Sequence, residues 1–474
     1  MATARKIAFN FIASSIGRVI GLFFSLASIG LTARALSTEG YGQFSTISAF
    51  LFLFMGLADL GLYSLMLREI SRPGVDEKYV VSNFFTLRVI SLAVFLAIAI
   101  LAVFCFPYTK EIKIGIIFCS SSIVFMSLSQ LLMPIFQKHL DTGKAALAEV
   151  VGRIFQFLMA LFFFQMNLGL FWFLFSLIFS SAATFAVNFI YSKKHISFTL
   201  GRDVVYLKKI FKMTLPIAAS IAFTMIYFRG NTILLSVLQP QKDVGLFNLG
   251  YKVLENLTFF PAALVGLIMP FLSKSAVENI SGFKNVLQKS FNLLSIGAIP
   301  LAFGGLFFSK FIVGILGGRD FIAAESSLKV LLFAVVFIFF GNLAGNALIA
   351  LNLQKKLAFA YLFGAVFSIF ANLFLITKYS YNGAAVGSLL TEGLVSVLMF
   401  FIIFKGINWA PSFSVFFKAI FAAIIMCLPM LFFKAGGNIS FLILFFVCSG
   451  IYFISLYLIR GITKEEMYSL IKTK

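Results

Sequence analysis

Residues 7–31 read IAFNFIASSIGRVIGLFFSLASIGL, a stretch in which Arg18 is the only charged residue. The hydrocarbon core of a bilayer is ~30 Å thick, so a helix that crosses it needs roughly 20 apolar residues. Comparable stretches follow along the whole chain, and the predicted spans are residues 7–31, 43–66, 83–106, 113–136, 146–166, 168–191, 212–236, 244–270, 290–309, 328–350, 357–377, 382–404, 413–433 and 439–459. The sequence therefore predicts an all-α polytopic membrane protein with about 14 transmembrane helices.

The composition and the charge distribution agree with a membrane protein. Hydrophobic residues make up 61% of the chain, charged residues 12%, and the mean hydropathy is +1.03. With the N-terminus inside, we assign about 23 of the 38 Lys and Arg residues to cytoplasmic segments, about 8 to external loops and about 7 to spans. Positive charge on cytoplasmic loops explains the net charge of +21 without a nucleic-acid partner. Both termini are predicted to be cytoplasmic.

The order of the spans suggests two halves. The longest predicted cytoplasmic connection, residues 192–211, falls between the sixth and seventh spans. Residues 39–44 (EGYGQF) open the second span, and residues 242–247 (KDVGLF) open the eighth in a similar way. We predict an N-terminal six-helix lobe at 1–200, a C-terminal six-helix lobe at 201–408, and an additional helix pair with a cytoplasmic tail at 409–474. Repeated halves of this kind are typical of transporters, which bind substrate between the halves near the membrane midplane.

Four short motifs resemble those of Wzx-type oligosaccharide flippases: residues 33–44 (ARALSTEGYGQF), 56–62 (GLADLGL), 243–248 (DVGLFN) and 316–321 (LGGRDF). The resemblance implies membership of the MATE-like multidrug/oligosaccharidyl-lipid/polysaccharide exporter superfamily, with two six-helix lobes around a central cavity. It also implies the substrate, an undecaprenyl-pyrophosphate-linked oligosaccharide that is moved to the outer leaflet of the bacterial cytoplasmic (inner) membrane. The motifs do not distinguish an O-antigen repeat unit from a related glycan.

Two arginines are the predicted contacts to the pyrophosphate. Arg18 lies about 16 Å along its span, close to midplane, and its guanidinium offers five donors in a fork that suits phosphate. Arg229 lies on a small-residue face of the seventh span. An alternative for Arg18 is a structural role, satisfied by carbonyls or by Asp59. Small and polar residues share the face of the first span that carries Arg18: Ser14, Arg18, Gly21, Ser25, Ser28 and Thr32.

Further polar residues inside the spans are candidate substrate contacts. Arg153 follows Glu149 by one helical turn, so a self-neutralising ion pair is the alternative to substrate binding. Lys252 and Glu255 present the same choice in the eighth span. Sugars are recognised by hydrogen-bonding groups, and this span is polar enough to line a glycan site. The predicted substrate-binding residues are Arg18, Arg229, Arg153, Lys252, Asn248, Asn256 and Ser25.

Buried carboxylates are the candidates for coupling transport to H+ or Na+. Asp59 and Glu392 lack an obvious local partner, and such groups tend to hold a proton; an inter-helix ion pair is the alternative. A coupling or gating role is also predicted for Glu149 and Glu255. Arg88 and Lys418 lie near predicted cytoplasmic ends, so we expect their long side chains to reach the interface.

Two other functions remain open. A MATE-type drug or metabolite exporter should favour acidic cavity residues, whereas the best-placed midspan charges here include Arg18 and Arg229. A membrane glycan polymerase or ligase should carry a large external loop, and the predicted external loops are short. His139 and His195 lie in cytoplasmic loops outside any metal-spacing motif, and the four cysteines form no CxxC pair. We therefore expect no enzyme activity, metal or cofactor; other polysaccharide-assembly membrane proteins are possible partners.

Overall fold

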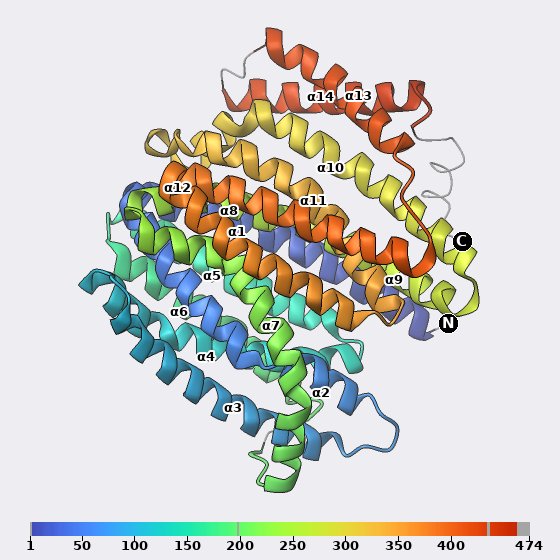
Figure 1. Cartoon of the computed structure of the whole chain (residues 1–474). Helices are drawn as coiled ribbons and strands as arrows, with labels where there is room; N and C mark the ends of the chain where they lie inside the picture. Colours follow the sequence, from blue (N-terminus) through green and yellow to red (C-terminus); the bar gives the residue numbers. More distant parts are fainter. Residues whose placement is uncertain (1, 197–198, 434–436, 462–474) are drawn as a thin grey trace. The chain divides into compact units, whose positions relative to one another are not determined.

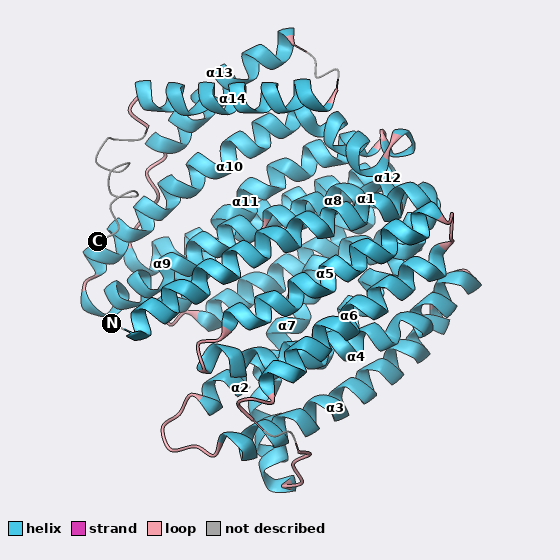
Figure 2. Ribbon diagram, turned by 180° about the vertical axis from the view of Figure 1, so that it is seen from behind, coloured by secondary structure: helices cyan, strands magenta, loops and turns pink. Residues whose placement is uncertain are grey.

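The computed structural model describes residues 2–196, 199–433 and 437–461, and every regular element within these ranges is a helix (Figure 2). In chain order the elements are α1 Ala2–Asp59, α2 Leu62–Ile70, α3 Glu77–Ala102, η1 Val103–Cys105, α4 Lys110–Lys138, α5 Thr142–Gln165, α6 Leu170–Ser192, α7 Val204–Leu238, α8 Gln241–Leu257, α9 Phe259–Glu278, α10 Ile280–Gly317, η2 Arg319–Phe321, α11 Ala324–Ala350, α12 Gln354–Ile407, α13 Ser414–Phe432 and α14 Asn438–Leu458. The all-α membrane architecture is confirmed.

The number of membrane spans depends on two backbone breaks. Among the described residues, eleven helices are long and apolar enough to span, or twelve with the bent α7 counted as one span. The 58 residues of α1 would extend about 87 Å at 1.5 Å per residue, far more than a bilayer core. Ser37 (φ 59°) breaks α1 and Ser380 (φ 49°) breaks the 54-residue α12. Counting both helices as two spans brings the twelve to the predicted fourteen.

Two predicted boundaries are wrong in ways that matter for the site. The predicted span 43–66 is not one helix, because α1 ends at Asp59 and α2 begins at Leu62. Leu60 (φ 51°) and Gly61 (φ 80°) between them take left-handed conformations. The third helix starts at Glu77 rather than at residue 83, and the Asp76 side chain caps it by accepting a hydrogen bond from the Tyr79 N–H.

The described residues form two compact units. Unit 1 comprises residues 1–249, 316–320 and 372–381, and unit 2 comprises residues 250–315, 321–371 and 382–474. Within unit 1, α1 packs on α4, α5 and α7, and α6 packs on α4 and α5 (Figure 1). Within unit 2, α9 packs on α11, and α13 lies beside α14 (Figure 1). The division into lobes at residues 200 and 408 stays a prediction.

The two glycine motifs that suggested a repeat touch each other inside unit 1. A Cβ atom on Gly42 would lie 1.8 Å from the carbonyl oxygen of Gln241, and one on Gly245 would lie 2.0 Å from that of Thr38. No side chain fits at either position. The backbones of α1 and α8 therefore meet directly at these glycines, which is a reason for glycine that the sequence alone did not reveal.

Candidate functional site

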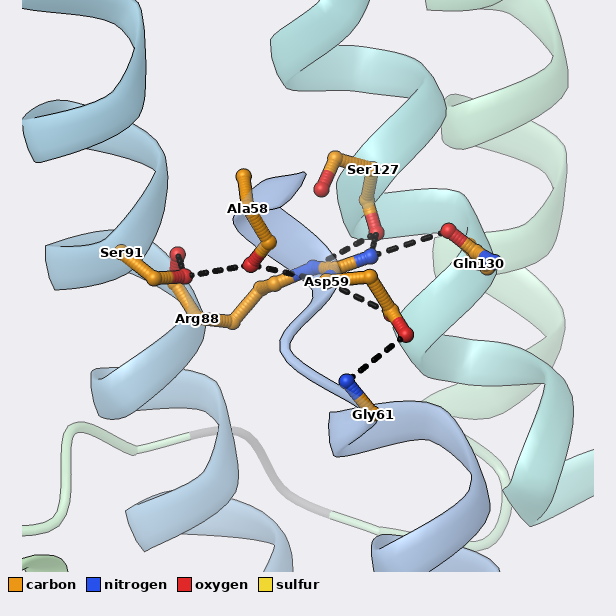
Figure 3. Close-up of polar contacts among 7 residues, drawn as sticks. All are labelled: Ala58, Asp59, Gly61, Arg88, Ser91, Ser127 and Gln130. Atoms are coloured by element: carbon orange, nitrogen blue, oxygen red, sulfur yellow. Dashed lines mark hydrogen bonds and ion pairs between the residues drawn. The ribbon is translucent and has the colours of Figure 1, made fainter. Parts of the chain in front are cut away.

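Arg88 is the centre of a buried polar network in unit 1. Its side chain extends from α3 and is fully buried. Nη1 donates to the Asp59 carboxylate at 2.7 Å and to the Ala58 carbonyl at 3.3 Å. Nη2 donates to the side-chain oxygen of Gln130 at 3.0 Å and, like Nε, to the carbonyl of Ser127 (Figure 3). One guanidinium thus joins the end of α1 to α3 and α4.

The helix break after Asp59 supplies the acceptors for Arg88. The last carbonyls of a helix have no partner within it, so the end of α1 leaves the Ala58 oxygen available. That oxygen also accepts a hydrogen bond from the Ser91 hydroxyl at 2.9 Å. The second carboxylate oxygen of Asp59 accepts from the Gly61 N–H at 3.1 Å. The left-handed turn at Gly61 is therefore stabilised by the same carboxylate that pairs with Arg88.

The expectation for Arg88 is wrong, and the structure decides between the two alternatives left open for Asp59. Arg88 does not reach toward an interface, because α3 begins at Glu77 and places it about 16 Å along the helix. Asp59 does not lack a partner; the inter-helix ion pair, which was the alternative, is what the structure contains. The partner is Arg88 of α3, whereas the sequence had suggested Arg18. The start of α3 was detectable from Asp76, a good N-cap residue that follows Pro73-Gly74.

A cavity of about 300 Å³ opens beside this network within unit 1. We call it the N-terminal cavity. It is walled by the second segment of α1 and by α4, α5 and α6, and Gln130 links it to Arg88. Its polar and charged lining includes Ser48, Ser129, Gln130, Glu149, Arg153 and Gln156.

Arg153 lies on the wall of the N-terminal cavity with loosely held partners. Its guanidinium is 3.9 Å from the Glu149 carboxylate, and Nη1 donates to the Gln156 side-chain oxygen at 3.4 Å. The side chains of Arg153 and Glu149 are 38% and 50% exposed. The self-neutralising pair considered from the sequence is therefore present, but it is long and open to solvent, which makes it weak.

The small-residue face of α1 packs against α5. Ser14 donates a hydrogen bond to the Thr142 hydroxyl at 3.2 Å, and a Cβ on Gly17 would lie 3.1 Å from the Ala146 methyl group. A Cβ on Gly21 would lie 4.0 Å from Cγ of Arg153. Close helix packing therefore accounts for part of this face. Arg18 and Ser25 belong to the same helix; the first is exposed and the second half-buried.

Arg229 is brought to the same part of unit 1 from α7. Its guanidinium carbon lies 5.1 Å from the ring centroid of Phe52, a cation–π distance. Phe52 itself lines the N-terminal cavity. Arg153 therefore lies on the wall of the N-terminal cavity, and Arg229 contacts a ring that lines the same cavity. The sequence predicted these two cations separately, and the fold brings both to one cavity, whereas a role for Arg18 stays a prediction.

The other predicted residues are distributed over both units. Asn248 is buried in unit 1, where it accepts from the Thr232 hydroxyl at 3.1 Å. In unit 2, Lys252 pairs with Glu255 at 2.6 Å, which is the self-neutralising alternative. Asn256 donates to the Lys252 carbonyl at 2.7 Å. Glu392 is half-buried on α12.

A second polar cluster ties helix ends together in unit 1. The imidazole rings of His139 and His195 stack with centroids 4.3 Å apart. Nε2 of His139 lies 3.1 Å from Glu77, and Nε2 of His195 lies 3.0 Å from Asp141. Within the described residues no group of three His, Cys, Asp or Glu side chains could hold a metal ion. The cluster therefore joins the ends of α3, α4 and α6 by hydrogen bonds and ring stacking.

Sequence reasoning missed Gln130, Gln156 and Phe52. Gln156 follows Arg153 by three residues, so helical spacing could have placed both on one face. Gln130 and Phe52 carried no such signal, because their importance comes from neighbours on other helices.

Comparisons with known proteins agree on one family and one fold. The model of the family described as polysaccharide biosynthesis protein matches residues 5–276. The "Probable low-salt glycan biosynthesis flippase Agl15" of Haloferax volcanii is 23% identical, over 81% of this chain and 80% of that protein. A Shigella flexneri protein whose name describes an O-antigen transporter is 24% identical, over 78% and 91%. The lipid II flippase MurJ, solved in an inward closed conformation, has the same fold, with a TM-score of 0.80 at 15% identity over 98% and 100% of the two chains.

Proposed function

The chain belongs to the polysaccharide biosynthesis protein family, and on this basis we propose that it flips an undecaprenyl-pyrophosphate-linked oligosaccharide across the bacterial cytoplasmic membrane. The cargo is an O-antigen repeat unit or a related glycan. The names of the relatives from Haloferax volcanii and Shigella flexneri support this class of substrate. The observation that carries the proposal is the placement of two arginines at one polar cavity of unit 1: Arg153 lines it, and Arg229 contacts Phe52, which also lines it.

Arginine suits the anionic part of this cargo. A guanidinium stays charged and can donate two parallel hydrogen bonds to a phosphate. We assign the pyrophosphate to Arg18 and Arg229. Neutral and paired polar groups suit the sugars, and we assign the glycan to Arg153, Ser25, Asn248, Lys252 and Asn256. The polyprenyl tail stays in the membrane lipid while the headgroup is transported.

Transport proceeds by alternating access, driven by an ion gradient or by the membrane potential. Asp59, Glu149, Glu255 and Glu392 are the proposed coupling or gating groups. The contacts of Asp59 support a gating role in particular, because it joins the break after α1 to Arg88 on α3. In liposomes with imposed H+ or Na+ gradients, Asp59→Asn should weaken the gradient dependence of transport. Unchanged dependence in Asp59→Asn and Glu392→Gln would remove these residues from coupling.

Drug export and glycan polymerisation are the competing functions. A cavity for cationic drugs should carry net negative charge, whereas Glu149 in the N-terminal cavity is offset by Arg153. A polymerase needs catalytic groups outside the membrane on a large loop. The longest external connection that we predict contains Arg319 and Asp320 in a single helical turn. We therefore favour transport without enzyme activity.

The location and orientation belong to the same proposal. The protein spans the membrane many times, and we propose the bacterial inner membrane with both termini in the cytoplasm. The excess of Lys and Arg in one set of loops supports this orientation. Other membrane proteins of polysaccharide assembly are proposed partners, because they would supply the lipid-linked glycan and consume it.

The test is a gene deletion in which surface glycan and the sidedness of lipid-linked oligosaccharide are measured together. We expect loss of surface glycan and intermediates held on the cytoplasmic leaflet. Wild type should restore both and Arg18→Ala should not, whereas Lys355→Ala, an exposed position far along the sequence, should serve as the control and restore both. Normal surface glycan with altered sensitivity to cationic dyes would favour drug export. Unpolymerised intermediates on the outer leaflet would favour an enzyme.

A further inference from the structure

The N-terminal cavity has the size of a site for one ring rather than for a whole oligosaccharide. Its volume of about 300 Å³ lies at the lower end of the range for ligand pockets, roughly 300–1,000 Å³. It is lined by four helix segments of unit 1, and Phe52 is part of the lining. A pyranose ring has an apolar face of C–H groups that can lie on an aromatic side chain.

Two serine hydroxyls in the wall have no hydrogen-bond partner. Ser129 is buried with 5% exposure, and its Oγ is unpartnered; the Oγ of Ser48 is also buried and unpartnered. Both residues line the N-terminal cavity. Buried polar groups in proteins nearly always find a partner, so an unsatisfied pair at one cavity indicates that something else supplies the hydrogen bonds.

The hydroxyls on α6 present acceptors to the same space. Ser180 donates its proton to the Gly152 carbonyl, Ser181 to that of Ile178, and Thr184 to that of Ser180. Their oxygens keep lone pairs, because each proton is already committed to a backbone carbonyl. All three residues line the N-terminal cavity. Its α6 wall is therefore suited to a ligand that donates several hydrogen bonds.

The α5 wall adds donors and no net charge. The Gln156 side-chain oxygen accepts from Arg153, which leaves its amide nitrogen as a donor. Arg153 and Glu149 carry opposite charges 3.9 Å apart. A bare cation would meet Arg153, and a phosphate would meet Glu149 and the acceptors on α6. Donors and acceptors without net charge match a neutral polyol.

We propose that the N-terminal cavity binds one sugar ring of the lipid-linked glycan. This inference rests on the proposed function and names the part of the cargo that enters the interior of unit 1. The ring lies against Phe52, its hydroxyls donate to the α6 oxygens and accept from Gln156, and Ser129 gains the partner that it lacks. The pyrophosphate remains outside, with Arg18 and Arg229.

The test compares the binding of three lipids, one bare and two bearing a sugar, to the full chain in nanodiscs. The probes are undecaprenyl pyrophosphate and the same lipid bearing one sugar, prepared with N-acetylglucosamine and separately with galactose. With wild type, we expect at least one of the sugar-bearing lipids to bind at least 5-fold more tightly than the bare lipid. Gln156→Leu should abolish this gain and leave bare-lipid binding unchanged. Gln137→Leu, a matched change on α4 outside the cavity lining, should keep the gain.

Ser129→Ala separates a binding role from a structural one. Removal of an unpartnered hydroxyl should leave the melting temperature unchanged or raise it, yet lower the sugar-dependent gain by about 2- to 10-fold, the value of one hydrogen bond. This variant also keeps the test decisive if Gln156→Leu fails to fold.

The outcomes are distinct for the two proposals. A gain equal in wild type, Gln156→Leu and Ser129→Ala would overturn the sugar site while the flippase proposal stands. No gain with either sugar would also overturn it. Variants that alter the sodium dependence of bare-lipid binding, with the gain intact, would make the cavity a cation site instead. If wild type binds neither lipid, the proposed function itself fails.

Discussion

Arg88 and Arg153 are both arginines on helices of unit 1, and Gln130 contributes to the surroundings of both, yet their environments differ. Arg88 is fully buried and donates to one carboxylate, one amide and two backbone carbonyls. Arg153 is 38% exposed and has Glu149 at 3.9 Å and Gln156 at 3.4 Å. The first guanidinium holds helices together, and the second keeps donors available for a ligand.

The comparison shows how a structural cation can be told from a functional one. Both lie well inside their helices, α3 and α5, so position along a helix does not separate them. The separating quantity is the number of hydrogen bonds that the guanidinium donates to fixed groups, which is large for Arg88 and small for Arg153. A cation that has exhausted its donors on the protein has none left for a phosphate or a sugar.

The largest effect is expected from Arg88→Ala. Removal of one partner leaves the Asp59 carboxylate buried without its cation, which typically costs about 3–5 kcal/mol. We expect a large fall in the melting temperature in detergent and in the amount of folded protein in the membrane. Arg88→Lys should lose less stability than Arg88→Ala, because lysine keeps a positive charge near Asp59. A melting temperature unchanged in Arg88→Ala would refute the structural role.

A smaller loss is expected from Gly152→Ala, beside the cavity. The added Cβ would lie 1.9 Å from the Thr184 hydroxyl and 2.9 Å from the Ser180 carbonyl oxygen. Overpacking of this kind costs about 1–3 kcal/mol, measured as a shift in thermal unfolding. The control is Gly230→Ala on α7, where nothing lies within 4 Å of the new atom. Equal stability of both variants would show that the α5–α6 contact is not tight.

Arg153→Ala should affect transport far more than stability. Exposed ion pairs contribute about 0–1 kcal/mol, so the melting temperature should change little. Loss of a charged hydrogen bond to the cargo should lower the rate of flipping in liposomes by about 10-fold or more. The flipping rate of Arg153→Lys should lie between those of wild type and Arg153→Ala, because lysine keeps the charge but lacks the planar guanidinium. Normal transport by Arg153→Ala would contradict the proposed difference between a functional Arg153 and a structural Arg88.

The smallest effect is expected at Tyr79 and Asp203, an exposed hydrogen-bonded pair. Its small contribution to stability is the reference against which the effects at Arg88 and Arg153 are compared. The Tyr79 hydroxyl and the backbone N–H groups of Tyr206 and Val205 donate to Asp203 and lower its pKa below the ordinary 3.8. A depressed carboxyl pKa stabilises the fold above the unfolded value, and this stabilisation disappears as the pH falls through the folded value. Tyr79→Phe should therefore be slightly less stable than wild type at pH 7, and the difference should shrink as the pH falls through the lowered pKa of Asp203 in the folded protein. A pH-independent difference would contradict this reason.

Much of the fold could be predicted from the sequence. Long apolar stretches are sufficient for spans, because a bilayer core leaves a chain few ways to satisfy its backbone other than helices. The glycines at 42 and 245 belong to the two motifs that suggested repeated halves, and the structure adds that both permit direct backbone contact. The break after Asp59 was not predicted, since residues 43–66 are apolar enough to be read as one span despite Asp59.

The candidate site depended more on the fold. Arg153 and Arg229 were identified as candidates from the sequence, but their approach to one cavity was not, because it requires α5 and α7 each to pack on α1. Gln130 and Ser129 looked like ordinary helix residues. Their meaning comes from Arg88 on another helix and from a cavity that no local pattern encodes.

The sequence by itself determined that this chain crosses a membrane many times as helices, that its midspan charges include arginines, and that its motifs resemble those of oligosaccharide flippases. Only the tertiary structure decided that Arg88 uses its donors within the protein, whereas Arg153 keeps donors available for a ligand. Only the tertiary structure also decided that His139 and His195 stack despite their separation along the chain. The reason is physical. Membrane insertion depends on hydrophobicity summed along one helix, whereas the fate of a buried charge depends on acceptors that neighbouring helices bring to it.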